Sequence, residues 1–116
     1  MSTLDIEALK TVVAEGRRTA GAIAASAEML SWRNRFRKTE ETDELVRVLY
    51  EDVPLVLRAQ SRTERFLRQI DVSAGRGVDG EQLEKAAAQL RETSSVVRLA
   101  MDDVLSDLQK LEELAC

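Results

Sequence analysis

The feature that most constrains the fold is an apolar spacing of three and four residues, which runs through three long segments of the chain. At 3.6 residues per turn, this spacing brings the apolar side chains onto one stripe of a helix. Each stripe therefore predicts a long helix with a coiled-coil-like heptad seam. The three predicted seams are Ile6, Leu9, Val13, Gly16, Ala20, Ile23, Ala27 and Leu30; Val46, Leu49, Val53, Val56, Gln60, Thr63, Leu67 and Ile70; and Leu83, Ala87, Leu90, Ser94, Val97, Met101, Val104, Leu108, Leu111 and Ala115.

Two polar stretches, "RKTEETDE" and "DVSAGRGVDG", interrupt the apolar spacing. They divide the chain into predicted helices at about 3–36, 40–71 and 80–115, and short connections of this kind make neighbouring helices antiparallel. The sequence thus predicts an all-α, elongated antiparallel three-helix bundle in which residues 1–116 form a single domain.

Polar residues at the predicted helix starts are suited to capping the free backbone N–H groups. Ser2 or Thr3 is expected to cap the first helix, Thr39 or Thr42 the second, and Asp79 the third.

One proline, Pro54, lies inside the second predicted helix. Proline removes a backbone donor and clashes with the preceding turn. We expect a kink there, and the alternative is a break into two helices with Asp52 as a new cap.

The chain has no histidine, and its only cysteine is the last residue, Cys116. The lack of histidine excludes Ser-His-Asp and Cys-His catalytic pairs as well as His-ligated zinc. We expect no enzymatic activity, no metal site and no cofactor, and no small-molecule substrate is evident from the sequence.

The same counts bear on localisation. No apolar run reaches the length of a transmembrane helix, which is about 18 residues or more, and "MSTLDIEALK" lacks the basic and apolar regions of a secretory signal. With a single cysteine, the expected setting is the reducing cytoplasm, away from the membrane.

The stretch "GRRTAGAIAASAEM" is rich in glycine and alanine and contains a G-x-x-x-x-G spacing. A phosphate-binding loop would continue with Lys and Ser or Thr, whereas Gly21 is followed by Ala22 and Ile23. The stretch also keeps the helical seam in phase. We interpret it as a helix whose small side chains allow close approach, with Gly16 on the seam and Gly21 off it.

A second apolar row runs along the first predicted helix, about 160° from its seam. It passes through Ala22, Ala25, Met29, Trp32 and Phe36. The row is either a surface for a partner or dimer, or part of a core that wraps around the helix under helix three. We favour the first interpretation and group Val48 and Leu55 of helix two with it. The predicted partner-binding residues are Ala25, Met29, Trp32, Phe36, Val48 and Leu55, with Arg33 and Arg37 at the rim.

Basic residues in "RNRFRK" interleave with two aromatic ones, a pattern that can bind nucleic acid through phosphate pairing and stacking. The net charge of −4, however, and the acidic residues that follow at once, argue against that function. Nucleic-acid binding is kept as the alternative, with Arg33, Arg35, Arg37, Lys38, Arg58, Arg62 and Arg65 as its residues.

"RRTAGAIAASAEML" resembles the phosphoacceptor helix of sensor histidine kinases, and "RFLRQIDVSAGR" is similar to the end of the second helix in their dimerisation hairpin. The likeness covers about 60 residues. Where the family has its histidine there is Glu15 or a neighbour, and its usual proline is Ala20. The resemblance implies a dimerising, hairpin-like regulator without phosphotransfer.

Taken together, these patterns favour a helical adaptor, regulator or chaperone of bacterial or phage type, which binds another protein or a second copy of itself. Its expected mechanism is the burial of an apolar helical stripe by the partner.

Overall fold

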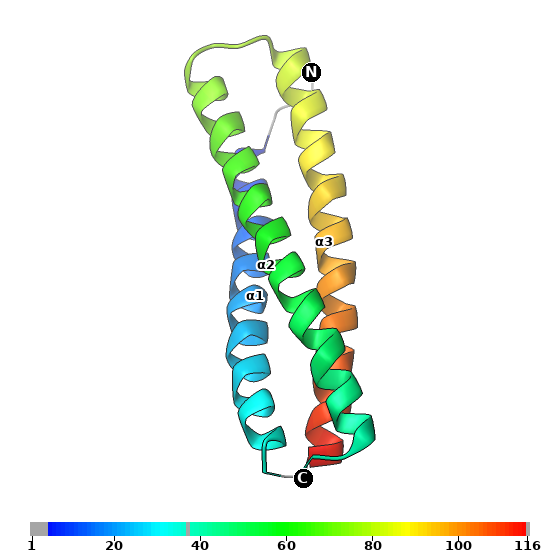
Figure 1. The fold of residues 1–116 in the computed structure, drawn as a ribbon. Helices are drawn as coiled ribbons and strands as arrows, with labels where there is room; N and C mark the ends of the chain where they lie inside the picture. Colours follow the sequence, from blue (N-terminus) through cyan, green and yellow to red (C-terminus); the bar gives the residue numbers. More distant parts are fainter. Residues whose placement is uncertain (1–4, 37, 116) are drawn as a thin grey trace.

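A computed structural model describes residues 5–36 and 38–115, and these residues form three long helices. The helices are α1 (Ile6–Asn34), α2 (Glu40–Gly75) and α3 (Gly80–Ala115). Successive helices run in opposite directions, and all three pairs are in contact (Figure 1). The bundle measures 58 × 18 × 18 Å, which confirms the predicted elongated three-helix bundle.

The core follows the predicted seams. Every buried apolar residue among the described ones lies on one of the three seams. Most of them form one continuous cluster in the half of the bundle nearer the α1–α2 turn, and a smaller cluster of Leu9, Ile70, Ala87 and Leu90 lies near the beginning of α1. Because α1 has 29 residues and the other two helices have 36, the α2–α3 connection projects past the start of α1 (Figure 1).

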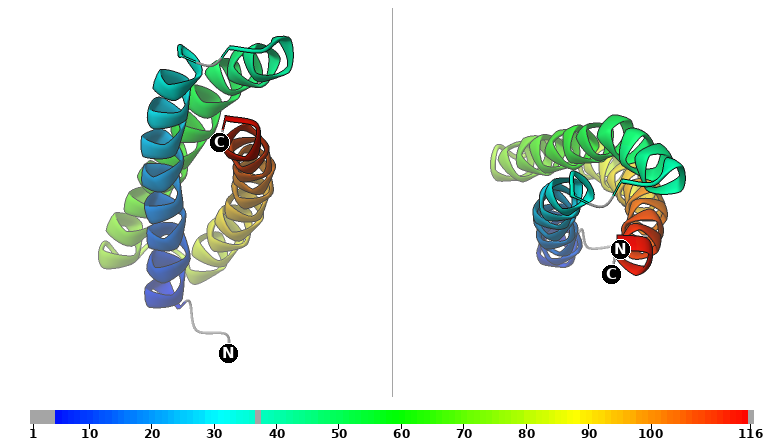
Figure 2. Two further views of the ribbon diagram at one scale, coloured as in Figure 1. Left: turned by 90° about the horizontal axis from the view of Figure 1, so that it is seen from below. Right: turned by 60° about the horizontal axis from the view of Figure 1, so that its bottom comes forward.

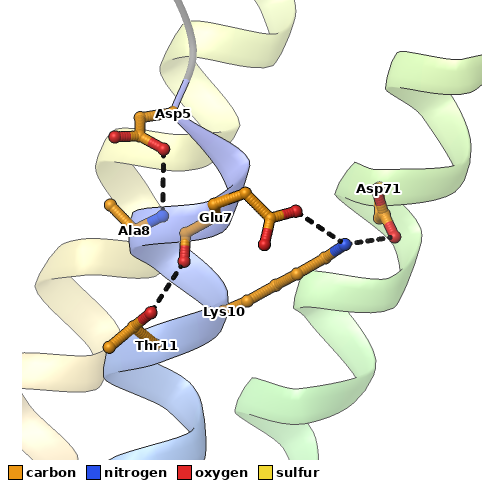
Figure 3. Close-up of polar contacts among 6 residues, drawn as sticks. All are labelled: Asp5, Glu7, Ala8, Lys10, Thr11 and Asp71. Atoms are coloured by element: carbon orange, nitrogen blue, oxygen red, sulfur yellow. Dashed lines mark hydrogen bonds and ion pairs between the residues drawn. The ribbon is translucent and has the colours of Figure 1, made fainter.

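The first helix begins later than predicted. Asp5 is the cap of α1, and its Oδ1 accepts a hydrogen bond of 3.0 Å from the backbone N–H of Ala8 (Figure 3). The expected caps Ser2 and Thr3 lie outside the described residues. A carboxylate at this position accepts a hydrogen bond from a free backbone N–H group, and its negative charge also interacts favourably with the positive end of the helix dipole.

A bridging lysine joins the beginning of α1 to α2. Lys10 Nζ lies 3.4 Å from Glu7 Oε1 and 3.4 Å from Asp71 Oδ2 (Figure 3). The hydrogen bond to Glu7, followed by that to Asp71, raises the pKa of Lys10 above its ordinary value.

The two residues predicted as alternative caps of the second helix act together. Thr39 is the cap of α2, and its Oγ1 accepts from the Thr42 N–H at 3.1 Å, while the Thr42 Oγ1 accepts from the Thr39 N–H at 2.9 Å. This reciprocal capping box fixes the start of α2. Beside it, Asn34 Nδ2 donates to Asp43 Oδ1 at 3.0 Å, which ties the end of α1 to the first turn of α2.

The second helix extends to Gly75, four residues past the predicted end. Two hydrogen bonds satisfy backbone carbonyls in its last turn. The Gly77 N–H donates to the Ala74 carbonyl and the Val78 N–H donates to the Ser73 carbonyl, which together form a Schellman motif. Gly77 has φ +73°, the left-handed conformation that this motif needs after the helix. The segment therefore stays helical until Gly77, which adopts the left-handed conformation and ends the helix. After this connection, Asp79 caps α3 as predicted by accepting from the Glu81 N–H at 3.1 Å.

Pro54 lies within α2, which continues unbroken through it. The alternative of two helices capped by Asp52 is therefore wrong. Pro54 is exposed, so the backbone carbonyl that loses its donor lies on the solvent side of the helix. Figure 2 shows that α2 is bent and not straight, in agreement with a proline at such a position.

A polar layer crosses the middle of the bundle. Gln60 of α2 is 4% exposed, and its Nε2 donates to the backbone carbonyl of Val13 in α1 at 3.0 Å. The side chain of Gln60 fills the space beside Gly16, where a Cβ atom added to the glycine would lie 2.5 Å from the Gln60 Oε1. The predicted close approach at Gly16 is thus made by a side chain of α2.

Candidate protein-binding site

The second apolar row of α1 is exposed and is not covered by α3. Met29 is 49% exposed, Trp32 57% and Phe36 72%, and Ala22 and Ala25 are also exposed. Of the two interpretations of this row, the wrapped core is therefore wrong for the protein as a single copy.

The aromatic end of the row is held together by ring contacts. The Trp32 and Phe36 rings meet edge to face, with centroids 5.5 Å apart and an interplanar angle of 73°. The guanidinium carbon of Arg35 lies 5.2 Å from the Trp32 ring centre, within the range of a cation–π interaction. These contacts restrict the rotamers of exposed side chains, and a partner that buries them therefore loses less entropy.

Beside this row, an open groove of about 930 Å³ runs between α1 and α2; we refer to it as the α1–α2 groove. Its floor includes the buried side chains of Leu49 and Val53. On α1 the groove is lined by Ala24, Ala25, Ala27, Glu28, Met29, Ser31, Trp32 and Arg35, and on α2 also by Tyr50, Pro54 and Leu57. The α1 wall is mostly small in its first half and aromatic at its end, and the volume of the groove lies within the usual range of ligand and peptide sites.

The two residues predicted for the site on α2 lie apart from the α1–α2 groove. Val48 is half-buried and Leu55 is 53% exposed, but neither lines the groove. At 100° per residue they lie about 160° and 140° around the helix from Tyr50, on the edge away from α1. The α2 wall is made by Tyr50, which is 83% exposed, together with Pro54 and Leu57.

The residues missed on α2 have a signal in the sequence. Tyr50, Pro54 and Leu57 each follow a seam residue directly, and they keep its spacing of three and four. The seam shows that α2 has two flanking edges but not which of them faces α1. Which edge faces α1 depends on the handedness of the bundle, and the apolar pattern is the same for either hand.

Charged residues surround the groove. Glu28 and Arg35 lie on its α1 wall. Arg58 does not line the groove, but its Nε donates to the carbonyl of Pro54, a groove residue, at 3.4 Å. Arg33, predicted at the rim, is exposed at the end of α1; Arg37 lies outside the described residues.

A further charged group lies one turn before Tyr50. Arg47 forms ion pairs with Glu44 and, at 3.6 Å, with Glu51. The hydrogen bond from Arg47 lowers the pKa of Glu44, and the same bond raises the pKa of Arg47. An apolar centre with a polar border is the usual arrangement of a protein interface.

The candidate nucleic-acid residues do not form one basic face. Arg33, Arg35 and Lys38 lie at the α1–α2 turn, and Arg37 lies outside the described residues. The remaining three, Arg58, Arg62 and Arg65, follow α2 away from the turn. The turn adjoins a second open groove at the same end of the bundle, lined by Glu40, Glu41, Glu44, Leu45, Lys110, Glu113 and Leu114. The acidic end of α3 thus lies close to the basic turn.

Within residues 5–36 and 38–115, no group of three or more acidic or cysteine side chains is placed to hold a metal ion. None of the helices in that part of the chain combines the length and the apolar content needed to span a membrane. Comparison with protein-family models, with curated proteins and with solved structures found no match. The likeness to the kinase hairpin therefore stays a prediction from the sequence.

Proposed function

We propose that this chain is a non-enzymatic protein-interaction module and that the α1–α2 groove binds an apolar face of another polypeptide. The proposal is carried by one observation: the exposed side chains of Met29, Trp32 and Tyr50 line the same groove, whose floor includes buried core residues. Exposed apolar patches of this kind commonly mark interaction sites. Tryptophan and tyrosine are also the residues that most often supply the binding energy of an interface.

The shape of the groove favours a helix as the bound element. It is long and open and lies between two antiparallel helices, so an amphipathic helix can lay its apolar side into it. Glu28 and Arg35 would then meet polar groups along the edge of the bound helix. The cytoplasmic setting stays a prediction from the single cysteine.

Photo-crosslinking in the organism that makes the chain tests this proposal. A photoreactive amino acid replaces Tyr50 in the groove or, as the matched control, Val72, which is also exposed on α2 but lies outside the groove. We expect Tyr50 to yield a discrete protein adduct that Val72 does not yield. Adding Met29→Glu should abolish the adduct, because it introduces a charge into the groove at a half-exposed position.

Circular dichroism of each variant confirms that the fold is retained. Equal adducts from Tyr50 and Val72, or a Tyr50 adduct that survives Met29→Glu, would contradict the proposal.

A further inference from the structure

The starting point is Gly21, for which the fold of a single copy has no use. It is exposed, and a Cβ atom built on it meets nothing within 4 Å. Glycine destabilises an exposed helix position relative to alanine. Neither the core nor a turn of a single copy requires Gly21, so the fold of one copy gives no reason for a glycine at this position.

Gly21 belongs to a face that repeats with its own heptad spacing. We define the outer α1 face as Ala14, Arg18, Gly21, Ala25, Glu28 and Trp32, which follow one another at intervals of four and three residues. All six residues are exposed, and the face lies opposite the inward seam of α1. Its last three members, Ala25, Glu28 and Trp32, also line the α1–α2 groove, so the two surfaces are continuous.

The chemistry of the outer α1 face is complementary to itself. Counted from Ile23, Arg18 and Glu28 lie five residues to either side and carry opposite charges. Gly21 and Ala25 lie two residues to either side, and both are small. Ala14 and Trp32 lie nine residues to either side and pair the smallest apolar side chain with the largest. Turned end for end, the face therefore presents each residue with its complement.

We propose that a second copy of this chain occupies the outer α1 face, with the two α1 helices antiparallel and a twofold axis near Ile23. This inference goes beyond the proposed function, because it concerns the outer α1 face, which shares only part of its residues with the α1–α2 groove. Arg18 of each copy meets Glu28 of the other, Gly21 faces Ala25, and Trp32 covers Ala14. Small residues at the centre bring the two helix axes close, so that the aromatic side chains at both ends can reach the second copy.

The charges favour a second copy over an unrelated helix. Neither Arg18 nor Glu28 has an ion-pair partner in the part of the chain that the structure describes. A symmetric contact is isologous, so each residue must be complementary to its counterpart across the axis. In the proposed contact, Arg18 of each copy faces Glu28 of the other, so the interface contains two such complementary pairs.

Sedimentation velocity of the purified chain over a range of concentrations tests the pairing. We expect a dimer for the wild type. Arg18→Glu or Glu28→Arg alone replaces two attractions by two repulsions and should raise the dissociation constant about tenfold or more. The double variant R18E/E28R restores both pairs with reversed signs and should dimerise like the wild type. The matched control, Arg91→Glu on the exposed surface of α3, should change nothing.

A second variant separates association from folding. Gly21→Leu places a better helix former in open space, so the single copy should melt at no lower temperature. The same side chain holds the two α1 helices apart and should abolish the dimer. A wild type that stays monomeric, a Gly21→Leu variant that still dimerises, or a double variant no tighter than its parents would overturn the inference.

The two proposals can fail separately. If the purified chain is a monomer and the Tyr50 crosslink captures a different protein, the groove binds a partner but the second copy is excluded. If the charge swap restores the dimer, the second copy is established whatever else the groove binds.

Discussion

Gly16 and Gly21 lie five residues apart on α1, yet the space beside each glycine is used differently. At Gly16 the space is taken by the buried amide of Gln60, which reaches past the glycine to the Val13 carbonyl. At Gly21 the space is open to solvent. One glycine completes the interior, and the other leaves room on the surface.

The comparison extends to the two faces of α1 on which these glycines lie. The inward seam holds side chains such as Ile23 and Leu30, which are 0% and 3% exposed. The outer face holds residues that contribute little to the folding of one copy. It follows that substitutions on the seam should change stability, whereas those on the outer face should change association.

The largest expected effect tests that division directly. Leu30→Ala removes a buried side chain and should lower the free energy of unfolding by about 2–5 kcal/mol. Trp32→Ala, two residues away, should change the unfolding of the single copy by less than about 1 kcal/mol, since the ring is 57% exposed. Urea denaturation at low protein concentration measures both. A large loss of stability in Trp32→Ala would show that the outer face is part of the fold.

A smaller effect is expected from Gly16→Ala. The added methyl group displaces Gln60 and breaks its bond to Val13, which costs about 1–3 kcal/mol. The better helix propensity of alanine returns about 1 kcal/mol. We expect a net loss of about 1 kcal/mol by thermal denaturation, and a smaller loss when Gln60 is already alanine, because the two sites are coupled. Equal losses in both backgrounds would show that Gln60 does not need the space.

Gly21→Ala should have the opposite sign. With nothing near the new methyl group, the substitution should stabilise a single copy by about 1 kcal/mol. Thermal denaturation of the monomer at low concentration measures the change. A loss of stability would mean that the position is strained or packed in a way that the open surroundings of Gly21 do not show.

The smallest expected effect concerns the ion pairs of Lys10 with Glu7 and Asp71. The folded-state pKa of Lys10 is raised by Glu7 and Asp71, so its contribution is complete below the unfolded pKa and is lost as the pH rises through the folded value. The wild type should therefore lose a little stability at alkaline pH, and Lys10→Met should lack this loss. Lys85→Met, whose ion pair lies within one helix, serves as the control. Identical alkaline profiles for Lys10→Met and the wild type would contradict the assignment.

The sequence predicted the interior of this bundle better than its surface. Burial in a helix is periodic, so the spacing of residues such as Leu49, Val53 and Val56 identifies the core without knowledge of the neighbouring helices. The start of α2 was also predictable, because capping is local to Thr39 and Thr42. The end of α2 was not, because the choice between Gly75 and Gly77 depends on which of them takes the left-handed conformation.

The candidate site was predicted on one wall only. Met29 and Trp32 stand out because they form a second period on their own helix. Tyr50 and Leu57 become part of the groove only when α1 lies on their side of α2, and Val48 and Leu55 would have formed the wall in a bundle of the opposite hand. Handedness is a property of how all three helices pack, so no single helix pattern carries it.

The Gln60 layer also determines how the helices align along their length. Heptad seams repeat every seven residues, so apolar side chains alone would allow α1 to slide by one repeat against α2. Such a slide would bring Leu9 or Ile23 to the place of Gly16 and leave the Gln60 amide against a bulky apolar side chain. Only one alignment accommodates it. The same alignment places Trp32 and Tyr50 on one groove, so a buried glutamine helps to decide which apolar side chains lie together on the surface.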